Sequence, residues 1–177
     1  MSTVIGVACA GGVVIAGDRL VVADGHVRSR SQRHVFDLGT VGAAVVGDPG
    51  DVDEFANRLD TDVRAYRTER GPLSIEPLAR MASDLAEELN VSGVVTARDD
   101  DGEPRLRSID ADGGVTADDL AAFGSGASVA LGALEAGHDP EADLDAAERF
   151  VRDALSTAAE RDAGTGDDID LYRLSEA

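Results

Sequence analysis

The sequence predicts an α+β fold in which stacked antiparallel sheets are covered by pairs of helices. The predicted elements occur in the order strands, two helices, strands, two helices and a last strand, which differs from the strict alternation of βαβ folds. Hydrophobic residues make up 43% of the chain and recur with the periods of strands and helices. The length suits a single domain, residues 1–177, that buries a core of its own.

Two short runs rich in valine and isoleucine open the chain, Thr3–Cys9 and Gly12–Ala16. The glycines between them indicate a tight antiparallel turn. A further pair of strands is expected over residues 34–38 and 41–46, joined around Gly39. Four strands therefore precede the first predicted helix.

Two amphipathic helices are expected next. The first carries an apolar stripe with spacings of 3, 4, 4 and 3 residues and ends at Gly71. The second is expected to begin after the N-cap Ser74 and to end at Asn90. The first stripe consists of Val52, Phe55, Leu59, Val63 and Tyr66.

The last part of the chain predicts two strands, two helices and a final strand. Their expected positions are residues 94–97, 104–109, 127–136, 144–158 and 169–174. The turn Gly124-Ser125-Gly126 opens the first of these helices and superficially resembles a dinucleotide-binding turn. However, Val129 occupies the position of the third glycine and no βαβ unit surrounds the turn, so no cofactor is expected.

The charge of the chain excludes several classes of partner. There are 16 basic and 35 acidic residues, which give a formal net charge of −19, and every basic residue is an arginine. Such an acidic surface repels phosphate backbones and anionic lipids, so neither nucleic acid nor a membrane is an expected partner. A surface of this kind suits a salt-rich cytosol, and we expect a halophilic source.

The few cysteines and histidines argue against metal chemistry. Cys9 is the single cysteine and cannot form an internal disulfide, and the three histidines are not at zinc-ligand spacing. Asp99–Gly102 lacks the first and twelfth ligands of a calcium loop. The apolar start of the chain lacks the basic region of a signal peptide. A reducing, cytoplasmic location is therefore expected.

The N-terminus carries a possible catalytic pair. Met1 precedes the small residue Ser2, and removal of an initiator methionine at such a position leaves Ser2 with a free α-amine. An α-amine with a pKa near 7.7–8.0 can act as general base for the hydroxyl of the same residue. The alternative interpretation is an ordinary start of a cytosolic chain.

Several segments of the chain resemble a known family. Ser2-Thr3-Val4-Ile5-Gly6-Val7 and the run from Gly12 to Arg19 are similar to the opening of proteasome β-type subunits and the related HslV-like proteases. Further similarity occurs in the same order along the chain. It covers Val45–Gly47 with Gly50-Asp51, Tyr66–Gly71, Ser108–Gly114, Gly124–Ala127, Gly132–Glu135 and Glu160–Gly166.

The resemblance implies a four-layer α-β-β-α sandwich, the fold of the N-terminal nucleophile hydrolases. It also implies peptide-bond hydrolysis of peptides or unfolded proteins by a homo- or hetero-oligomeric ring. Proteasome α-type subunits and a regulatory ATPase are the partners that it suggests, and no cofactor is implied.

Carried over by position, the resemblance places the nucleophile at Ser2, the catalytic aspartate at Asp18 and an oxyanion-hole N–H at Gly47. The polar residues that surround the terminal amine in the family correspond to Ser125, Asp162 and Thr165. Two positions differ from the family. The nucleophile is serine instead of threonine, and His34 stands where the family has an essential lysine.

The role of His34 depends on its charge. An imidazolium near Asp18 would partly replace the lysine, whereas a neutral imidazole would serve as base for Ser2. The missing lysine also leaves a non-catalytic structural or regulatory subunit as an alternative. A third alternative is an amide hydrolase of the same fold that acts on a small metabolite.

Overall fold

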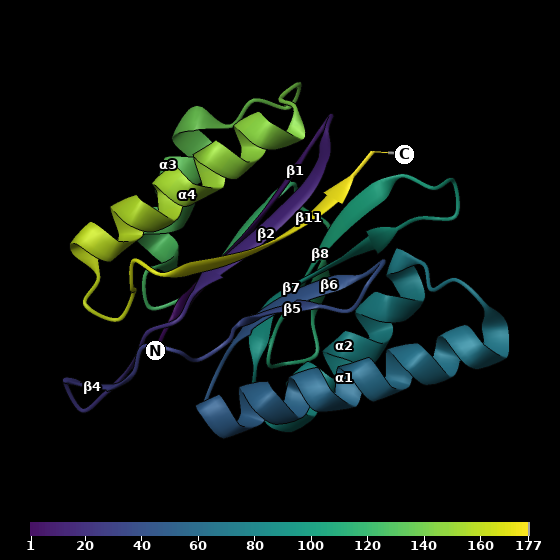
Figure 1. Ribbon diagram of the computed structural model, residues 1–177, viewed down its shortest axis with the longest axis horizontal. Coiled ribbons are helices and arrows are strands. Elements are labelled where there is room, and N and C mark those ends of the chain that lie inside the picture. The colour runs from purple at the N-terminus through teal and green to yellow at the C-terminus, as the bar shows by residue number, and fades with distance from the viewer. Residues whose placement is uncertain (177) are drawn as a thin grey trace.

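The computed structural model describes residues 1–176 and contains two packed antiparallel sheets between two pairs of helices (Figure 1). The four-stranded sheet has the order β10-β1-β2-β11. These strands span Leu120–Gly124, Thr3–Cys9, Gly12–Asp18 and Ile169–Ser175. The five-stranded sheet has the order β5-β6-β7-β8-β9. Its strands span Val35–Asp37, Gly42–Val46, Ser92–Arg98, Pro104–Ile109 and Val115–Thr116.

The helices form the two outer layers. Helices α1 (Pro49–Arg70) and α2 (Ile75–Leu89) cover the five-stranded sheet, and α3 (Ala127–Gly137) and α4 (Leu144–Arg161) cover the four-stranded sheet (Figure 1). The expected α-β-β-α sandwich is therefore confirmed. Among the helices of residues 1–176, none combines the length and apolar character that crossing a lipid bilayer requires.

Three layers of apolar side chains hold the sandwich together. One lies between α1, α2 and the five-stranded sheet, and it contains Phe55 and Leu59 of the predicted stripe. A second lies between α3, α4 and the four-stranded sheet. The third lies between the sheets, where Val4 and Ile15 face Val94. The helix stripes were correctly predicted, because each helix buries one face and its apolar residues therefore recur with the helix period.

The structure also contains strands that the sequence analysis missed. Strands β3 (Val21–Ala23) and β4 (His26–Ser29) form a separate hairpin, and β9 and β10 follow the turn at Gly113. Strand β4 is largely exposed and therefore lacks the apolar alternation that marks a half-buried strand. Strand β10 is rich in alanine, which has a low strand propensity.

We predict that Gly42→Ala destabilises the fold by about 1–3 kcal/mol, because a methyl group there overpacks the space between the sheets. A Cβ on Gly42 would lie 2.4 Å from Cδ1 of Tyr172, whose hydroxyl donates a hydrogen bond to the carbonyl of Gly39. Gly132→Ala is the matched control, because its Cβ meets open space on α3 and alanine favours a helix. Urea unfolding at constant salt measures both; equal stability of Gly42→Ala and wild type would contradict the packing argument.

Candidate active site

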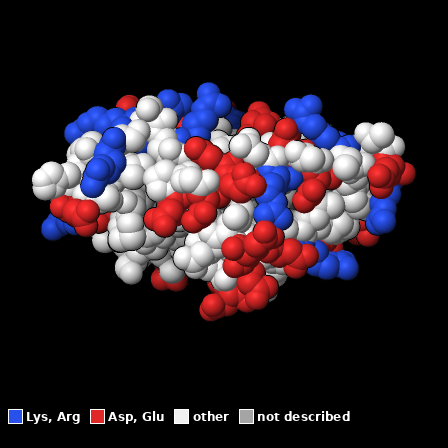
Figure 2. Space-filling model, turned by 90° about the horizontal axis from the view of Figure 1, so that it is seen from below, with Lys and Arg blue, Asp and Glu red and all other residues white. Residues whose placement is uncertain are grey.

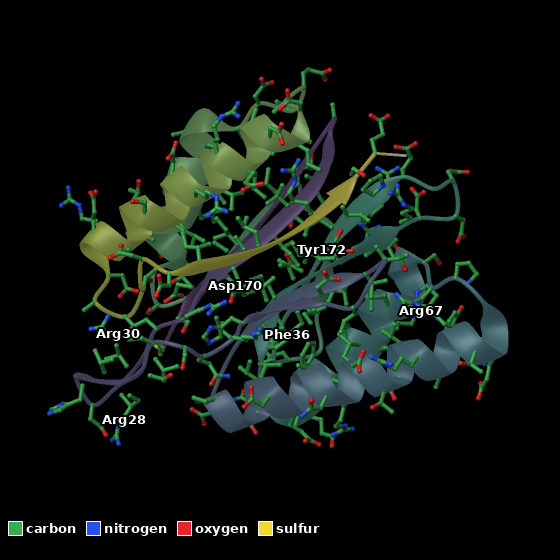
Figure 3. The ribbon with its side chains drawn as sticks, viewed as in Figure 1. Arg28, Arg30, Phe36, Arg67, Asp170 and Tyr172 are labelled. Atoms are coloured by element: carbon green, nitrogen blue, oxygen red, sulfur yellow. The ribbon has the colours of Figure 1, made fainter. Side chains whose placement is uncertain are left out.

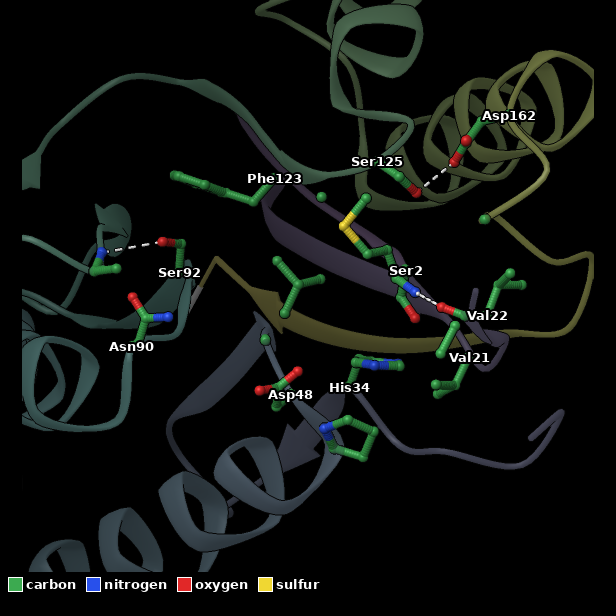
Figure 4. Close-up of a pocket in the computed structure, with 18 of the residues that line it drawn as sticks. Ser2, Val21, Val22, His34, Asp48, Asn90, Ser92, Phe123, Ser125 and Asp162 are labelled. Carbon is green, nitrogen blue, oxygen red and sulfur yellow. Dashed lines mark hydrogen bonds between the residues drawn. The ribbon is translucent and has the colours of Figure 1, made fainter. Parts of the chain in front are cut away.

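A cavity of about 880 Å³ opens beside the N-terminus (Figure 4). Five of the seven residues predicted for the site line it. They are Ser2, His34, Gly47, Ser125 and Asp162. They come from five separate places in the sequence: the start of β1, the approach to β5, the β6–α1 loop, the β10–α3 turn and the end of α4. The fold thus brings together residues that the sequence keeps far apart.

Asp18 lies behind the cavity and is fully buried at the end of β2. Its carboxylate accepts hydrogen bonds from the backbone N–H groups of Thr3 (2.8 Å), Leu20 (3.0 Å) and Gly166 (2.7 Å). Burial raises the pKa of Asp18, while these three donors and the nearby His34 oppose that shift. Because all three backbone partners are donors, they favour the ionised carboxylate. Through these hydrogen bonds the carboxylate links Thr3, at the start of β1, to the loops that contain Leu20 and Gly166.

Thr165, the other predicted residue behind the cavity, belongs to a chain of hydroxyl groups. Its hydroxyl donates to Asp162 (2.6 Å) and lies 2.7 Å from that of Thr3. The hydroxyl of Ser125 also donates to Asp162, at 2.5 Å. Burial raises the pKa of Asp162, whereas the hydrogen bonds from Ser125 and Thr165 and the charge of the terminal amine lower it. The lowering effects outweigh burial, so the pKa of Asp162 lies below its ordinary value. Asp162 is therefore a carboxylate held in place at the cavity wall.

Ser2 is almost fully buried, and the chain holds it from both sides. Its hydroxyl donates to the carbonyl of Leu20, and its own carbonyl accepts a hydrogen bond from the N–H of Ser125 (3.1 Å). The amine of Met1 donates to the carbonyl of Val22 at 2.8 Å (Figure 4). The N-terminal segment thus lies along the hairpin strand β3, with Ser2 at the cavity.

His34 contacts the main chain of Asp18, because its Nδ1 lies 2.7 Å from the carbonyl oxygen of that residue. A carbonyl can only accept, so Nδ1 carries the proton, and Nε2 holds the lone pair of the neutral ring. Burial lowers the pKa of His34 and outweighs the opposing effects of the Asp18 carbonyl and carboxylate. The geometry therefore favours the neutral imidazole over the imidazolium as the state of His34.

Gly47 lies in the loop between β6 and α1, close to the next element of the sheet. A Cβ on Gly47 would lie 2.7 Å from Cγ1 of Val91, which precedes β7, so any larger residue would force this loop or the Val91 side chain to shift. The following residues begin α1, whose N-terminus presents the positive end of the helix dipole. A developing negative charge in this corner of the cavity would be stabilised.

Sequence reasoning missed several residues at the site. Thr3 is fully buried, and its hydroxyl accepts a hydrogen bond from the N–H of Gly126 (2.9 Å) while contacting Thr165. Other missed residues line the cavity: Asp48, Asn90, Ser92 and Phe123. A polar side chain inside the apolar first strand was a usable signal for Thr3. Within residues 1–176, no three His, Cys, Asp or Glu side chains gather as metal ligands would.

The chain is similar to known proteins over nearly its whole length. Residues 1–174 match the family described as "Proteasome subunit". The chain is 31% identical over 180 residues to proteasome subunit beta 1 of Staphylothermus marinus, covering 98% of this chain and 84% of that protein. It is 34% identical over 186 residues to proteasome subunit beta 2 of Korarchaeum cryptofilum, covering 99% and 92%. The chain therefore belongs to the proteasome subunit family, as a β-like member with the N-terminal nucleophile hydrolase fold.

Proposed function

We propose that this chain is a β-type subunit that hydrolyses peptide bonds with Ser2 as nucleophile, after removal of Met1. It acts in the cytoplasm, within a ring assembly that includes proteasome α-type subunits and receives unfolded substrates from a regulatory ATPase. One observation carries the proposal: Ser2 shares a single cavity with His34, Gly47, Ser125 and Asp162. The β subunits to which the chain is similar support it.

The reaction begins when the hydroxyl oxygen of Ser2 bonds to the carbonyl carbon of the scissile peptide. The hydroxyl proton passes to the α-amine of Ser2, and the N–H of Gly47 stabilises the oxyanion. The protonated amine then gives its proton to the departing peptide nitrogen as the C–N bond breaks. A water molecule attacks the resulting ester, and the second product leaves with a carboxyl group while Ser2 regains its proton.

The remaining site residues position Ser2 and its amine. Asp18 holds the N–H of Thr3, which fixes the residue that follows the nucleophile. Ser125 holds the carbonyl of Ser2 through its backbone and Asp162 through its side chain. The negative charge of Asp162 stabilises a protonated amine nearby. Nε2 of the neutral His34 is an acceptor at the cavity for the hydroxyl or the amine of Ser2.

A non-catalytic subunit is the second candidate function, and one observation favours it. The chain has no lysine, and within residues 1–176 the carboxylate of Asp18 contacts three backbone N–H groups instead of a side-chain cation. A site that lacks the lysine cation but still provides hydrogen-bond donors for the Asp18 carboxylate can be stable without being reactive. The two candidates differ in whether a free amine and a reactive hydroxyl exist at Ser2.

Intact mass spectrometry of the protein purified in high salt tests the proposal directly. We expect a mass lower than that of the full sequence by one methionine residue, and a mass increase of one equivalent after treatment with an acylating peptide inhibitor. A protein that retains Met1 has no amine on Ser2 and contradicts the proposed mechanism. A processed protein that the inhibitor does not modify favours the non-catalytic candidate.

A further inference from the structure

Polar side chains are rare in the interior of this chain, and most of them lie around the proposed nucleophile. Within residues 1–176, eight polar or charged side chains are buried. Five of the eight belong to the candidate active site: Ser2, Thr3, Asp18, His34 and Thr165. Thr3 is the one member of this group that the sequence analysis did not place in the site. Because burying a hydroxyl group is unfavourable unless it forms hydrogen bonds, the contacts of Thr3 explain its position.

Thr3 contacts three separate parts of the fold. Its backbone N–H donates to Oδ1 of Asp18, at the end of β2 (2.8 Å). Its hydroxyl oxygen accepts a hydrogen bond from the N–H of Gly126, at the start of α3 (2.9 Å). The same hydroxyl lies 2.7 Å from that of Thr165, in the loop after α4. Thr3 therefore links these three parts at the position next to Ser2.

The proton of each hydroxyl in this network can be assigned from its partners. Asp162 is a carboxylate, which only accepts, so the hydroxyl of Thr165 donates its single proton to Oδ2 of Asp162 (2.6 Å). Thr165 must then accept in its contact with Thr3, and Thr3 donates. The N–H of Gly126 donates to the oxygen of Thr3. The donors therefore run in one direction, from the start of α3 to Asp162, and each hydrogen bond of such a chain strengthens the next.

The donors of this network end on one oxygen of Asp162. The hydroxyl of Ser125 donates to the same oxygen, Oδ2, at 2.5 Å (Figure 4). Within residues 1–176, no side chain donates a hydrogen bond to Oδ1. In the proposed mechanism, the charge of Asp162 stabilises the protonated amine of Ser2. Oδ1 is the oxygen that remains available for this amine.

The side chains that hold Asp162 are neutral, and the arginines of this chain lie at its surface. No arginine is among the buried side chains of residues 1–176, and none lines the cavity. In Figure 2 arginine side chains lie on the surface among acidic ones, and in Figure 3 Arg28 and Arg30 point away from the body of the molecule. Since the chain also has no lysine, hydrogen bonds from hydroxyl groups fix the orientation of this carboxylate.

Gly126 leaves room for the contact between the two threonines. A Cβ on Gly126 would lie 2.6 Å from the hydroxyl oxygen of Thr165 and 2.8 Å from that of Thr3. Its φ of −93° is one that other residues also adopt, so the missing side chain matters for space and not for backbone conformation. The glycine at the start of α3 thus permits the two hydroxyl groups to meet.

We propose that Thr3 is a positioning residue for the proposed reaction. Its hydroxyl directs that of Thr165 to one oxygen of Asp162, which leaves the other oxygen, Oδ1, for the amine. Thr3 does not line the cavity, so it acts through other residues without touching the substrate. The inference rests on the proposed function, because the amine of Ser2 is free only after removal of Met1.

The hydroxyl of Thr3 can be removed with little change in the shape of the side chain. Thr3→Val should lower kcat by about 10- to 100-fold, because a carboxylate that is out of place supports the amine poorly. KM should stay unchanged, because Thr3 does not contact the substrate. Thr3→Ser keeps the hydroxyl and should restore kcat. The measurement is turnover of a fluorogenic peptide in high salt, with kcat expressed per site that the acylating inhibitor labels, so that unfolded or unprocessed protein is not counted.

Thr96→Val is the matched control. Thr96 is fully buried like Thr3, and its hydroxyl donates to the carbonyl of Arg105 at 2.8 Å, within the paired strands β7 and β8. Both valine variants should lose stability in urea unfolding, but Thr96→Val should keep the wild-type kcat. Three results overturn the inference while the proposed peptidase remains: wild-type kcat in Thr3→Val, an equal loss of kcat in both valine variants, or a Thr3→Ser protein as slow as Thr3→Val.

A second variant decides the question if far-UV circular dichroism shows that Thr3→Val does not fold. Gly126→Ala keeps both hydroxyl groups but places a methyl group between them, so we expect the same loss of kcat at unchanged KM. Gly132→Ala, in open space on the same helix, is its control. Wild-type kcat in Gly126→Ala overturns the inference. A wild-type protein that hydrolyses no peptide overturns the proposed function, and the inference with it.

Discussion

Ser2→Ala is expected to lower peptidase activity by at least about 10⁴-fold, because it removes the hydroxyl oxygen that forms the acyl bond in the proposed mechanism. Alanine is as small as serine, so removal of Met1 and a free α-amine are expected in the variant as in the proposed active protein. The variant also loses the hydrogen bond to the carbonyl of Leu20, a single contact of a buried hydroxyl. That loss is worth about 1 kcal/mol in stability, too little to unfold the chain.

Two matched variants separate the loss of the nucleophile from a change in structure. Ser2→Thr keeps the hydroxyl and adds the β-methyl group that restricts χ1, so we expect it to retain activity. Ser128→Ala changes an exposed serine on α3 and should have no effect. The measurements are turnover of a fluorogenic peptide and inhibitor labelling by intact mass. Hydrolysis at the wild-type rate in Ser2→Ala would show that another group carries the reaction.

Much of the fold was predictable because its layers are regular. The stripe from Val52 to Tyr66 repeats with the helix period, and α1 buries four of those residues as expected. The hairpin β3–β4 was not predictable, since its outer strand faces solvent and its residues carry no burial pattern. The exposed segments of this chain are thus the ones that local sequence describes least, and they include β4.

The family resemblance names candidate residues for the site, but it does not give their contacts. Family motifs pointed to Asp18 and Ser125, but the three donors to Asp18 come from Thr3, Leu20 and Gly166, which only the tertiary fold brings together. The state of His34 was left open for the same reason. Its charge depends on burial and on a contact with a carbonyl oxygen, and the residues next to His34 in the sequence predict neither of these.

His34→Gln is expected to lower turnover by on the order of 10²-fold without changing the pH at which activity appears. Nδ1 of His34 donates to the carbonyl of Asp18 and so fixes the ring at the cavity that Ser2 also lines. In the proposed mechanism this ring positions the hydroxyl and amine of Ser2. If the α-amine is the base, activity rises with pH near its ordinary pKa of about 7.7–8.0 in both proteins. If the imidazole is the base, the wild-type rise lies below about 6.5, because burial lowers the pKa of His34, and it disappears in the variant.

The same substitution predicts a change in stability that does not depend on catalysis. Above about pH 6.5 the imidazole is neutral in both the folded and the unfolded chain, so His34 adds no pH dependence. As the pH falls below this value, the unfolded chain takes up a proton before the folded one, because the folded pKa is lowered. Stability of the wild type therefore falls toward acid, and the part due to His34 is absent in His34→Gln. His26→Gln is the control, since His26 is exposed at the start of β4. Urea unfolding of the three proteins between pH 5 and 8 measures the difference. If the free energy of unfolding depends on pH in the same way in wild type and His34→Gln, then folding does not change the pKa of His34, and the prediction is wrong.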